Sequence, residues 1–475
     1  KTAGCVFTTG PGLTNGISGL AACFFDNVPL VTLVGQVNTK LNLAKKFKTK
    51  MVGFQEVQHL DLLDKISDST YKINSGKKYL NSRSKILNEC NNKSIVLEVN
   101  DDTQREKIIL IKKTKKIDKN KIKKKLKIPS SIFINSQKPV IILGSGAKKL
   151  LEDNKVIKKV SNLRIPKVLS WGGQRFQKHL KSEGLFGRHS KGVGNKIILN
   201  SDLVIAVGCS LLQHQTGKIA KKFAPNAKII FVNTSKNEIN RAKYFFGKRF
   251  YGVEADALDF LKEVIKKRSF LTLSKKLNLD NIDNNKVKII PPIKIIHKFL
   301  SSVSKDYIVF SDAGATLSWT YQAANLLKHP PEIYTSFNLH SMGYANCAAI
   351  GAANKKKKIL VIIGDGSIPM NSQELIHCKN KNIKFLILDN EGYGIIRQTQ
   401  KDFYKSSFLG SDFRDKSAHL PKFSVEKILK SFELKTSIIN EKQIENFNLK
   451  KFLSFKDSSA LICKINYFHR VEEDI

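Results

Sequence analysis

Short apolar runs alternate along the chain with polar stretches, and the alternation is clearest between residues 359 and 397. Ile359–Ile363 and Phe385–Leu388 are continuous apolar runs, as expected of strands that are buried on both faces of a parallel sheet. Asn371–Lys379 lies between them and has helical character. A turn follows each strand, at residues 364–367 and 389–394. The pattern predicts a unit of strand, turn, helix, strand and turn.

Polar side chains occupy both turns of this unit. Asp365 follows the first strand between two glycines, and Asn390 follows the second strand. If the strands are parallel neighbours, both turns lie at the carboxyl edge of the sheet, where open α/β sheets bind ligands. Mg²⁺ favours few protein oxygens, with substrate phosphates and water completing its octahedron. The two turns therefore predict a metal-bridged diphosphate site, and the alternative is an ordinary βαβ unit with polar turns.

The same alternation at the start of the chain predicts a first α/β domain. It begins with a buried-strand pattern at Cys5–Thr9 and continues with a helix from Gly16 to Phe25. Further strands are predicted at Leu30–Val34 and Ser94–Val99. Because this domain begins directly on a central strand, we expect its N-terminal part to be missing from this sequence.

Two more α/β domains are predicted to follow. Apolar strands of the second are Pro139–Leu143, Ile165–Trp171, Leu203–Gly208 and Ile229–Asn233. The third holds the unit described first, with further strands at Ile308–Phe310 and Ala460–Ile465. Polar linkers at residues 101–129 and 268–292 separate the domains. The predicted fold class is α/β, with three Rossmann-like or flavodoxin-like parallel-sheet domains at residues 1–110, 130–268 and 290–475.

Composition narrows the class of protein. Of the 475 residues 41% are hydrophobic, which is normal for a globular protein. No apolar stretch approaches the roughly 20 residues of a membrane-spanning helix. The 7 cysteines are scattered and include no CxxC pair. This distribution favours reduced thiols in a cytoplasmic protein over a disulfide framework or a zinc site.

The net charge of +42 raises the alternative of a basic nucleic-acid-binding protein. The excess is nearly all lysine and is spread over the chain, whereas arginine is scarce. Arginine is the residue favoured for bidentate contacts to phosphates and bases. We therefore interpret the lysines as solvated surface residues, as codon bias in an AT-rich genome would produce, and expect no specific nucleic-acid partner.

The two polar turns also resemble a known signature. Gly364-Asp365-Gly366, followed some two dozen residues later by Asp389-Asn390, is similar to the thiamine-diphosphate signature, which opens with GDG and closes with NN. In that family the Asp and the second Asn bind Mg²⁺, and the residue two positions further on adds its main-chain carbonyl. The resemblance implies the ligands Asp365, Asn390 and Gly392. Asp389 replaces the usual first Asn and the spacing is slightly short, but neither departure removes a ligand.

Residues 7–37, FTTGPGLTNGISGLAACFFDNVPLVTLVGQV, and the later GFQEV resemble the pyrimidine-binding domain of acetolactate synthases and their relatives. In that family a catalytic glutamate lies well upstream of the TTGPG turn, in a region that this sequence does not contain. We therefore expect it upstream of Lys1, assign no catalytic residue, and do not put Glu56 in its place. The resemblance implies that Gln55 lines the substrate side, and the alternative is an ordinary loop amide.

Residues 201–208, SDLVIAVG, and 223–228, FAPNAK, resemble the central domain of the acetolactate synthase group. Some members hold FAD there, some ADP and some nothing, so FAD is a possible cofactor. Gly144-Ser145-Gly146 matches only half of a dinucleotide fingerprint. Residues 184–189, GLFGRH, fall where those enzymes have a substrate-facing loop, which implies carboxylate or phosphate contacts from Arg188 and His189. The alternative is that both are loop polar groups in water.

Residues 311–316, SDAGAT, and 341–344, SMGY, carry the resemblance in the third domain. In acetolactate synthase relatives the first turn cradles the diphosphate, and backbone N–H groups at a helix start suit an anion. There a large apolar residue before Gly-Tyr props thiamine into a bent shape; Met342 fits this position, with core packing as the alternative. The implied cofactor-binding residues are Ala313, Gly314, Ala315, Thr316, Ser341, Met342, Gly343, Gly364, Asp365, Gly366, Ser367, Asn390, Gly392, Tyr393, Gly394 and Ile395.

The resemblance covers most of the chain and implies a thiamine-diphosphate- and Mg²⁺-dependent enzyme. Such an enzyme decarboxylates a 2-oxo acid such as pyruvate and transfers the acyl carbanion to a carbonyl acceptor. A homodimer or homotetramer is also implied, because in the family the active site forms between two subunits. IRQTQ and FNLHSMGY look closer to acetolactate synthase-like enzymes of surface-polysaccharide clusters. A sugar-related carboligase, a non-ligating decarboxylase and an inactive fragment are therefore kept as alternatives.

Overall fold

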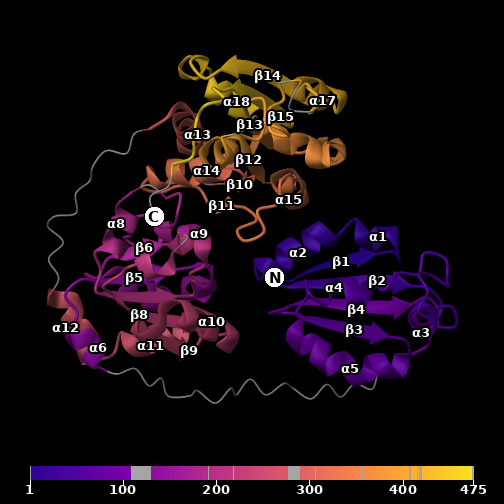
Figure 1. Ribbon diagram of the computed structural model, residues 1–475, viewed down its shortest axis with the longest axis horizontal. Coiled ribbons are helices and arrows are strands. Elements are labelled where there is room, and N and C mark those ends of the chain that lie inside the picture. The colour runs from indigo at the N-terminus through magenta and orange to yellow at the C-terminus, as the bar shows by residue number, and fades with distance from the viewer. Residues whose placement is uncertain are drawn as a thin grey trace. The chain divides into compact units, whose positions relative to one another are not determined.

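The computed structural model describes residues 2–108, 130–190, 192–217, 219–276, 289–304, 306–354, 357–405, 408–414, 416 and 420–472. The chain divides into two compact units, Lys1–Lys123 with Ser336–Ser341, and Lys124–Thr335 with Met342–Ile475. Within the described residues the strands form three sheets, and every strand pair is parallel (Figure 1). This confirms the predicted α/β class with three parallel-sheet domains.

The first unit has a sheet covered by helices on both faces. Its described strands, in spatial order, are β1 (Ala3–Phe7), β2 (Leu30–Gln36), β4 (Ser94–Asn100) and β3 (Ser69–Ile73). Its helices are α1 (Pro11–Thr14), α2 (Ile17–Phe25), α3 (Ala44–Phe47), α4 (His59–Leu63) and α5 (Gly76–Glu89). Val96 of β4 packs in one apolar cluster with α1, α2 and α4, whereas its neighbours Ile95 and Leu97 pack in another with α5. Burial on both faces is typical of parallel sheets.

The prediction of a buried strand at Cys5–Thr9 is wrong. In the structure β1 is an edge strand of the described sheet, and Val6 is 78% exposed. An apolar run does not distinguish an edge strand from a central strand, because it reports side-chain character and not pairing. The predicted helix at Gly16–Phe25 is present as α2, but α1 precedes it as a separate turn with Pro11 at its start.

The second unit holds two sheets. The described strands of the first sheet, in spatial order, are β6 (Lys167–Leu169), β5 (Pro139–Leu143), β7 (Leu203–Val207), β8 (Lys228–Asn233) and β9 (Phe250–Glu254). All residues of β5 and β7 are buried, as their continuous apolar runs predict. The strand predicted at Ile165–Trp171 is shorter, because Pro166 lacks an N–H and the 3₁₀ segment η3 (Trp171–Lys178) follows.

Helices surround this central sheet, and one of them replaces part of a predicted linker. They include α6 (Ser131–Ile134), η2 (Ser145–Glu152), α7 (Asn154–Ser161), α8 (Val193–Leu199), α9 (Gln213–Thr216), α10 (Lys236–Phe246), α11 (Ala257–Val264) and α12 (Arg268–Lys276). The linker predicted at residues 268–292 begins as α12, because Phe270 is buried against Phe133 of α6 with ring centroids 5.4 Å apart. Residues 109–129 and 277–288 of the two predicted linkers lie outside the described residues.

The second sheet of this unit carries the turns of interest. Its described strands, in spatial order, are β11 (Ile333–Tyr334), β10 (Tyr307–Ser311), β12 (Lys358–Gly364), β13 (Ile383–Asp389), β15 (Ser459–Lys464) and β14 (Lys435–Asn440). Its helical segments include α13 (Pro291–Ser302), α14 (Ala315–Asn325), α15 (Tyr344–Ala352), η6 (Asp365–Cys378), α16 (Gly394–Thr399), α17 (Val425–Ser431) and α18 (Leu449–Ser454). No described helix is both long and apolar enough to cross a membrane.

The helical character predicted at Asn371–Lys379 is present, but the segment begins earlier and is not a regular α-helix. The segment η6 is 3₁₀-like, begins at Asp365 directly after β12, and kinks at Asn371, where φ is −141° and ψ is 43°. Pro369 lies inside it and removes one backbone donor. As a result, Asp365 is the first residue of a tight helical segment.

Close backbone packing accounts for the half fingerprint at Gly144-Ser145-Gly146. The N–H of Gly146 donates to the carbonyl of Gly208 at 2.9 Å. A Cβ on Gly144 would lie 2.3 Å from the Gly208 oxygen and 2.6 Å from the Cys209 sulfur. The turns after β5 and β7 therefore touch backbone to backbone, and these glycines are required whether or not a dinucleotide binds.

Gly144→Ala is expected to destabilise the central sheet by about 1–3 kcal/mol, because the new methyl group meets backbone atoms that cannot move aside easily. The measurement is thermal unfolding of the full chain. Gly351→Ala in α15 is the matched control, since a Cβ there meets nothing within 4 Å. Equal melting curves for the two variants would contradict the packing interpretation.

Candidate functional site

Three turns meet at the carboxyl edge of the last sheet. Strands β10, β12 and β13 are parallel neighbours, and β11 pairs on the other side of β10, so the chain order reverses between β10 and β12 (Figure 1). Asp312 follows β10, Asp365 follows β12 and Asn390 follows β13. Ligands bind open α/β sheets outside such a switch point. The topology thus places the predicted turns where a ligand site is expected.

Asp365 and Gly392, two of the three predicted metal ligands, are joined directly. The N–H of Gly392 donates to Oδ2 of Asp365 at 3.0 Å. Asn390, the third predicted ligand, lies in the same loop as Gly392 and is buried. Burial, reinforced by the neighbouring Asp389 carboxylate, raises the pKa of Asp365 from 3.8 to about 8. A carboxylate in this position is disfavoured unless a cation or further donors stabilise its charge.

Glycines allow the two turns to pack tightly. A Cβ on Gly366 would lie 2.5 Å from the ring of Tyr393, and a Cβ on Gly394 would lie 2.7 Å from the Asn390 amide nitrogen. The sequence-predicted residues Gly366, Tyr393 and Gly394 are therefore in contact with the loop that carries Asn390. Ile395, also predicted, lies in the first turn of α16 and is half-buried.

The turn at 313–316 supplies a helix start beside these loops. Gly314 is the N-cap residue of α14, has φ of 80°, and no side chain caps the helix. Ala313 and Thr316 are buried, and the Thr316 hydroxyl oxygen would lie 3.5 Å from a Cβ on Gly364. An uncapped helix start presents N–H groups that suit an anion. The predicted residues Ala313 to Thr316 and Gly364 are thus brought together.

Asp312 is a residue that the sequence analysis did not select. Its carboxylate accepts from the N–H of Gly343 at 3.1 Å and from the N–H of Ala345 at 2.8 Å, and it is hydrogen-bonded to the Ser367 side chain. Burial raises its pKa, and these hydrogen bonds oppose that effect. It therefore links the turn after β10 to the start of α15 and to the turn after β12. A polar residue directly after a buried strand was the available signal.

Met342 and Gly343 precede α15. Gly343 has φ of 76°, and a Cβ there would lie 2.7 Å from the Asn371 amide nitrogen and 2.9 Å from the Cβ of Met370. The turn therefore packs against the kinked part of η6. Met342 is 37% exposed, so it is not a core residue of the described part of the second unit. Ser341 precedes Met342 in the chain and ends the segment Ser336–Ser341, which belongs to the first unit.

The predicted substrate contacts Arg188 and His189 lie in a loop that is hydrogen-bonded to α9 and to α14. The N–H of Arg188 donates to the carbonyl of His214, and the Gln322 side chain donates to the carbonyl of His189 at 2.7 Å. Gln322 lies seven residues beyond Ala315 in α14, which is about 10 Å along the helix. Their loop is therefore held against the last turns of α14.

Gln55 and Glu56 lie in the first unit. Gln55 has φ of 60°, and its carbonyl accepts from the Thr9 hydroxyl at 3.2 Å in the TTGPG turn. The Glu56 carboxylate is buried and accepts from the N–H groups of Ala44, Val52 and Gly53. Burial raises the pKa of Glu56, but these bonds outweigh it and the pKa is lowered. Glu56 thus braces its loop, which agrees with leaving it out of the catalytic assignment.

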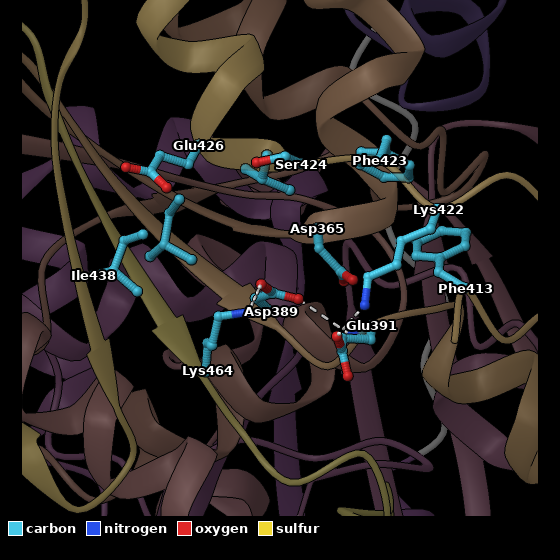
Figure 2. A pocket seen from close by; sticks show the side chains of 12 residues that line it. Asp365, Asp389, Glu391, Phe413, Lys422, Phe423, Ser424, Glu426, Ile438 and Lys464 are labelled. Atoms are coloured by element: carbon cyan, nitrogen blue, oxygen red, sulfur yellow. Dashed lines mark hydrogen bonds and ion pairs between the residues drawn. The ribbon is translucent and has the colours of Figure 1, made fainter. Parts of the chain in front are cut away.

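A cavity of about 180 Å³ lies beside Asp365, at the carboxyl edge of β13, β15 and β14. Figure 2 shows Asp389 meeting Lys464 on one side, with a separation of 3.3 Å, and Lys422 reaching toward Glu391 on the other, at 3.7 Å. Charged and apolar side chains line it together: Asp365, Asp389, Glu391, Phe413, Lys422, Phe423, Ser424, Val425, Glu426, Ile438, Ile462 and Lys464. The acidic side chains are thus balanced in part by lysines.

The oxygen atoms at these turns fit a metal that is shared with a ligand. Among the described residues, no three His, Cys, Asp or Glu side chains gather as a protein-only metal site. A carboxylate, an amide oxygen and a main-chain carbonyl are hard ligands of the kind that Mg²⁺ takes when phosphates and water complete its shell. The raised pKa of Asp365 and the uncapped start of α14 agree with a cation and an anion bound together.

Family models match three parts of the chain. The "Thiamine pyrophosphate enzyme" models match as the N-terminal TPP binding domain at residues 1–62, the central domain at 131–264 and the C-terminal TPP binding domain at 312–462. Together these matches extend over most of the chain, in the order that the sequence analysis expects.

Similar curated proteins are acetolactate synthases. A probable acetolactate synthase large subunit of Methanococcus aeolicus is 29% identical, over 85% of this chain and 72% of that protein. The acetolactate synthase isozyme 1 large subunit of Escherichia coli is 24% identical, over 97% of this chain and 82% of that protein. Among solved structures, benzoylformate decarboxylase from Polynucleobacter necessarius matches with a TM-score of 0.73 and 15% identity, covering 98% of this chain and 87% of that one. The last comparison supports the fold.

Asp312→Ala is expected to lower the free energy of unfolding by about 1–3 kcal/mol, because buried donors lose their acceptor. Asp202→Ala is a matched control, since Asp202 also accepts from two N–H groups, of Gln137 and Lys138, and from one hydroxyl, of Ser136. Only Asp312→Ala should speed hydrogen exchange at the amides of Gly343 and Ala345. Unchanged exchange there would refute the linking role of Asp312.

Proposed function

Since the chain belongs to the thiamine-pyrophosphate (thiamine-diphosphate) enzymes and is acetolactate synthase-like, we propose that it binds thiamine diphosphate through Mg²⁺ and decarboxylates a 2-oxo acid such as pyruvate. The acyl group then passes to a carbonyl acceptor. The observation that carries the proposal is the hydrogen bond between Gly392 and the buried Asp365, which joins the turns after β12 and β13 at the carboxyl edge of the last sheet, beside its switch point.

Asp365, Asn390 and Gly392 would hold the Mg²⁺ ion. Hard oxygen ligands of this kind leave room for phosphate oxygens and water. A divalent cation favours the carboxylate form of Asp365, which burial otherwise disfavours. The N–H groups at the start of α14, after Gly314, would bind the diphosphate that the ion neutralises.

The predicted cofactor-binding residues that do not hold the metal would orient the cofactor. When bound, thiamine diphosphate supplies an electron sink for the loss of CO₂ from a 2-oxo acid. Met342 would support the ring system from the turn that Asp312 and Asn371 fix. Gly366, Tyr393 and the neighbouring predicted residues would hold the loops close around the diphosphate. Gln55, Arg188 and His189 stay predictions as substrate contacts.

The product of the reaction depends on which compound accepts the acyl group. The similar acetolactate synthases favour transfer of the acyl group to a second carbonyl compound. With pyruvate alone, acetolactate is therefore the expected product. Acetaldehyde alone would instead indicate a non-ligating decarboxylase, and a product that forms only with an added sugar-derived carbonyl compound would indicate a carboligase.

Further parts of the proposal concern assembly, location and FAD. We expect a homodimer or homotetramer in the cytoplasm, to be measured by light scattering and by fractionation of the source cells. FAD in the central domain stays a prediction; an absorbance spectrum of the purified protein checks it. The Gly144–Gly146 motif adds no support for FAD, because its glycines are required by the contact with Gly208.

Asp365→Ala is expected to weaken thiamine-diphosphate binding in the presence of Mg²⁺ by more than about tenfold, because a charged ligand of the ion is lost. Isothermal titration calorimetry of the full chain measures this, with removal of Mg²⁺ by a chelator as a second comparison. Asp306→Ala is the control, since Asp306 precedes β10 at the opposite edge of the sheet and pairs with Lys358 at the surface. Equal affinities for the two variants would contradict the proposed ligand.

A further inference from the structure

A buried arginine contacts the loop that carries the proposed metal ligands. Arg397 lies in α16, and its side chain is 4% exposed. Its Nη2 donates to the carbonyl of Asn390 at 2.9 Å, and its Nη1 reaches the carbonyl of Glu391 at 3.5 Å. The guanidinium therefore turns back from the helix onto the loop that precedes it. A planar group with several donors is suited to fixing two neighbouring carbonyls at once.

Asp412 holds this arginine from the other side. Its carboxylate lies 3.7 Å from Nη1 of Arg397 and is itself buried. It also accepts from the guanidinium of Arg414 through two bonds, at 3.0 and 2.6 Å. The ring of Tyr467 lies against both guanidinium groups, with its centroid 3.5 Å from Arg414 and 5.4 Å from Arg397. Arg397 is thus confined between a carboxylate, an aromatic ring and the loop.

Backbone hydrogen bonds also join residues 411–413 to the loop at residues 390–393. The N–H of Tyr393 donates to the carbonyl of Ser411 at 2.8 Å, and the N–H of Phe413 donates to the carbonyl of Glu391 at 3.0 Å. Gly392 and Asp412 form an antiparallel bridge. The contact is so close that a Cβ on Gly392 would lie 2.3 Å from the Ser411 oxygen and 3.3 Å from Nη1 of Arg397.

These contacts define one conformation of residues 390–393. In that conformation the N–H of Gly392 reaches Asp365, the first proposed ligand. A buried ion pair such as Arg397–Asp412 is weak evidence for stability, because the loss of hydration offsets much of the attraction. Its expected contribution is instead to select one arrangement of its surroundings. Groups that orient metal ligands from outside commonly change metal affinity by 10–100-fold when they are altered.

We propose that Arg397, held in place by Asp412, is a positioning residue for Mg²⁺-diphosphate binding. It fixes the carbonyls of Asn390 and Glu391 and so sets the geometry in which Asn390 and Gly392 can act as ligands, without itself touching the ion or the substrate. This inference rests on the proposed function, in which the same loop binds the metal.

The test compares Arg397→Met with Arg241→Met in the full chain. Arg241 is a matched control, since it also donates to a backbone carbonyl, of Ser210, and pairs with a carboxylate, of Glu238, but lies in the central domain. Calorimetry gives the thiamine-diphosphate Kd in saturating Mg²⁺, and a Mg²⁺ titration at fixed thiamine diphosphate gives the midpoint. Arg397→Met should raise both the Kd and the Mg²⁺ concentration at the midpoint by 10–100-fold, and Arg241→Met should raise them by less than twofold.

Two further variants separate positioning from folding. Arg397→Lys keeps the charge but not the planar fork, so it should fold and show an intermediate loss of affinity. The double variant Arg397→Met with Asp412→Asn removes both members of the buried pair but also takes the carboxylate from the partly exposed Arg414, so its Mg²⁺ affinity should stay low whatever its melting temperature. Parental affinity in the double variant would overturn the positioning role. So would parental affinity in Arg397→Lys and in Arg397→Met.

The failure of the proposed function is distinguishable from the failure of this inference. If the parent chain binds no thiamine diphosphate in the presence of Mg²⁺, the proposed function is refuted and the positioning role falls with it. If the parent chain binds and all Arg397 variants bind equally well, only the positioning role is refuted.

Discussion

The hydrogen bond from the N–H of Gly392 to the buried carboxylate of Asp365 joins the turns after two neighbouring parallel strands. Parallel pairing of β12 and β13 brings the ends of both strands to one sheet edge, and tight glycine turns let the loops approach each other there. The arrangement is costly for the isolated chain, because burial and Asp389 both oppose a charge on Asp365. A site built around a disfavoured carboxylate is understandable if a cation normally shares it.

Contacts from the surrounding structure hold these turns in place. Asp312 ties the turn after β10 to the start of α15, and Arg397 with Asp412 confines the loop after β13. Both sets of contacts use buried polar groups, which contribute little net stability but favour a single arrangement of the loops. The apolar strands provide the rigid platform, and the buried polar groups at their ends specify how the loops lie on it.

Strands buried on both faces could be predicted closely from the sequence, because every residue of such a strand is apolar. The strand predicted at Ile359–Ile363 is present as Lys358–Gly364, and the one at Pro139–Leu143 has the predicted bounds. The first strand could not be placed, because Val6 and its neighbours are apolar although β1 lies at an exposed edge. The kink in η6 depends on Pro369 and Asn371 and on tertiary packing, so helical spacing did not reveal it.

Some residues of the candidate site could also be predicted from the sequence, and others could not. The carboxyl-edge rule brought together Asp365 and the loop of Asn390, since it depends only on strand order. It applied equally to Asp312, which was overlooked although it too follows a buried strand directly. Arg397 could not be found by that rule, because its importance comes from contacts with Asp412 and with backbone carbonyls that only the fold creates.

The measurement that tests this account most directly is the location of the metal in crystals of the full chain grown with thiamine diphosphate and Mn²⁺, which replaces Mg²⁺ and is visible by its anomalous scattering. The account predicts an anomalous peak at the side chains of Asp365 and Asn390 and the main-chain carbonyl of Gly392, beside the diphosphate of the cofactor. A peak held by other residues, or thiamine diphosphate bound away from the turns after β12 and β13, would contradict it.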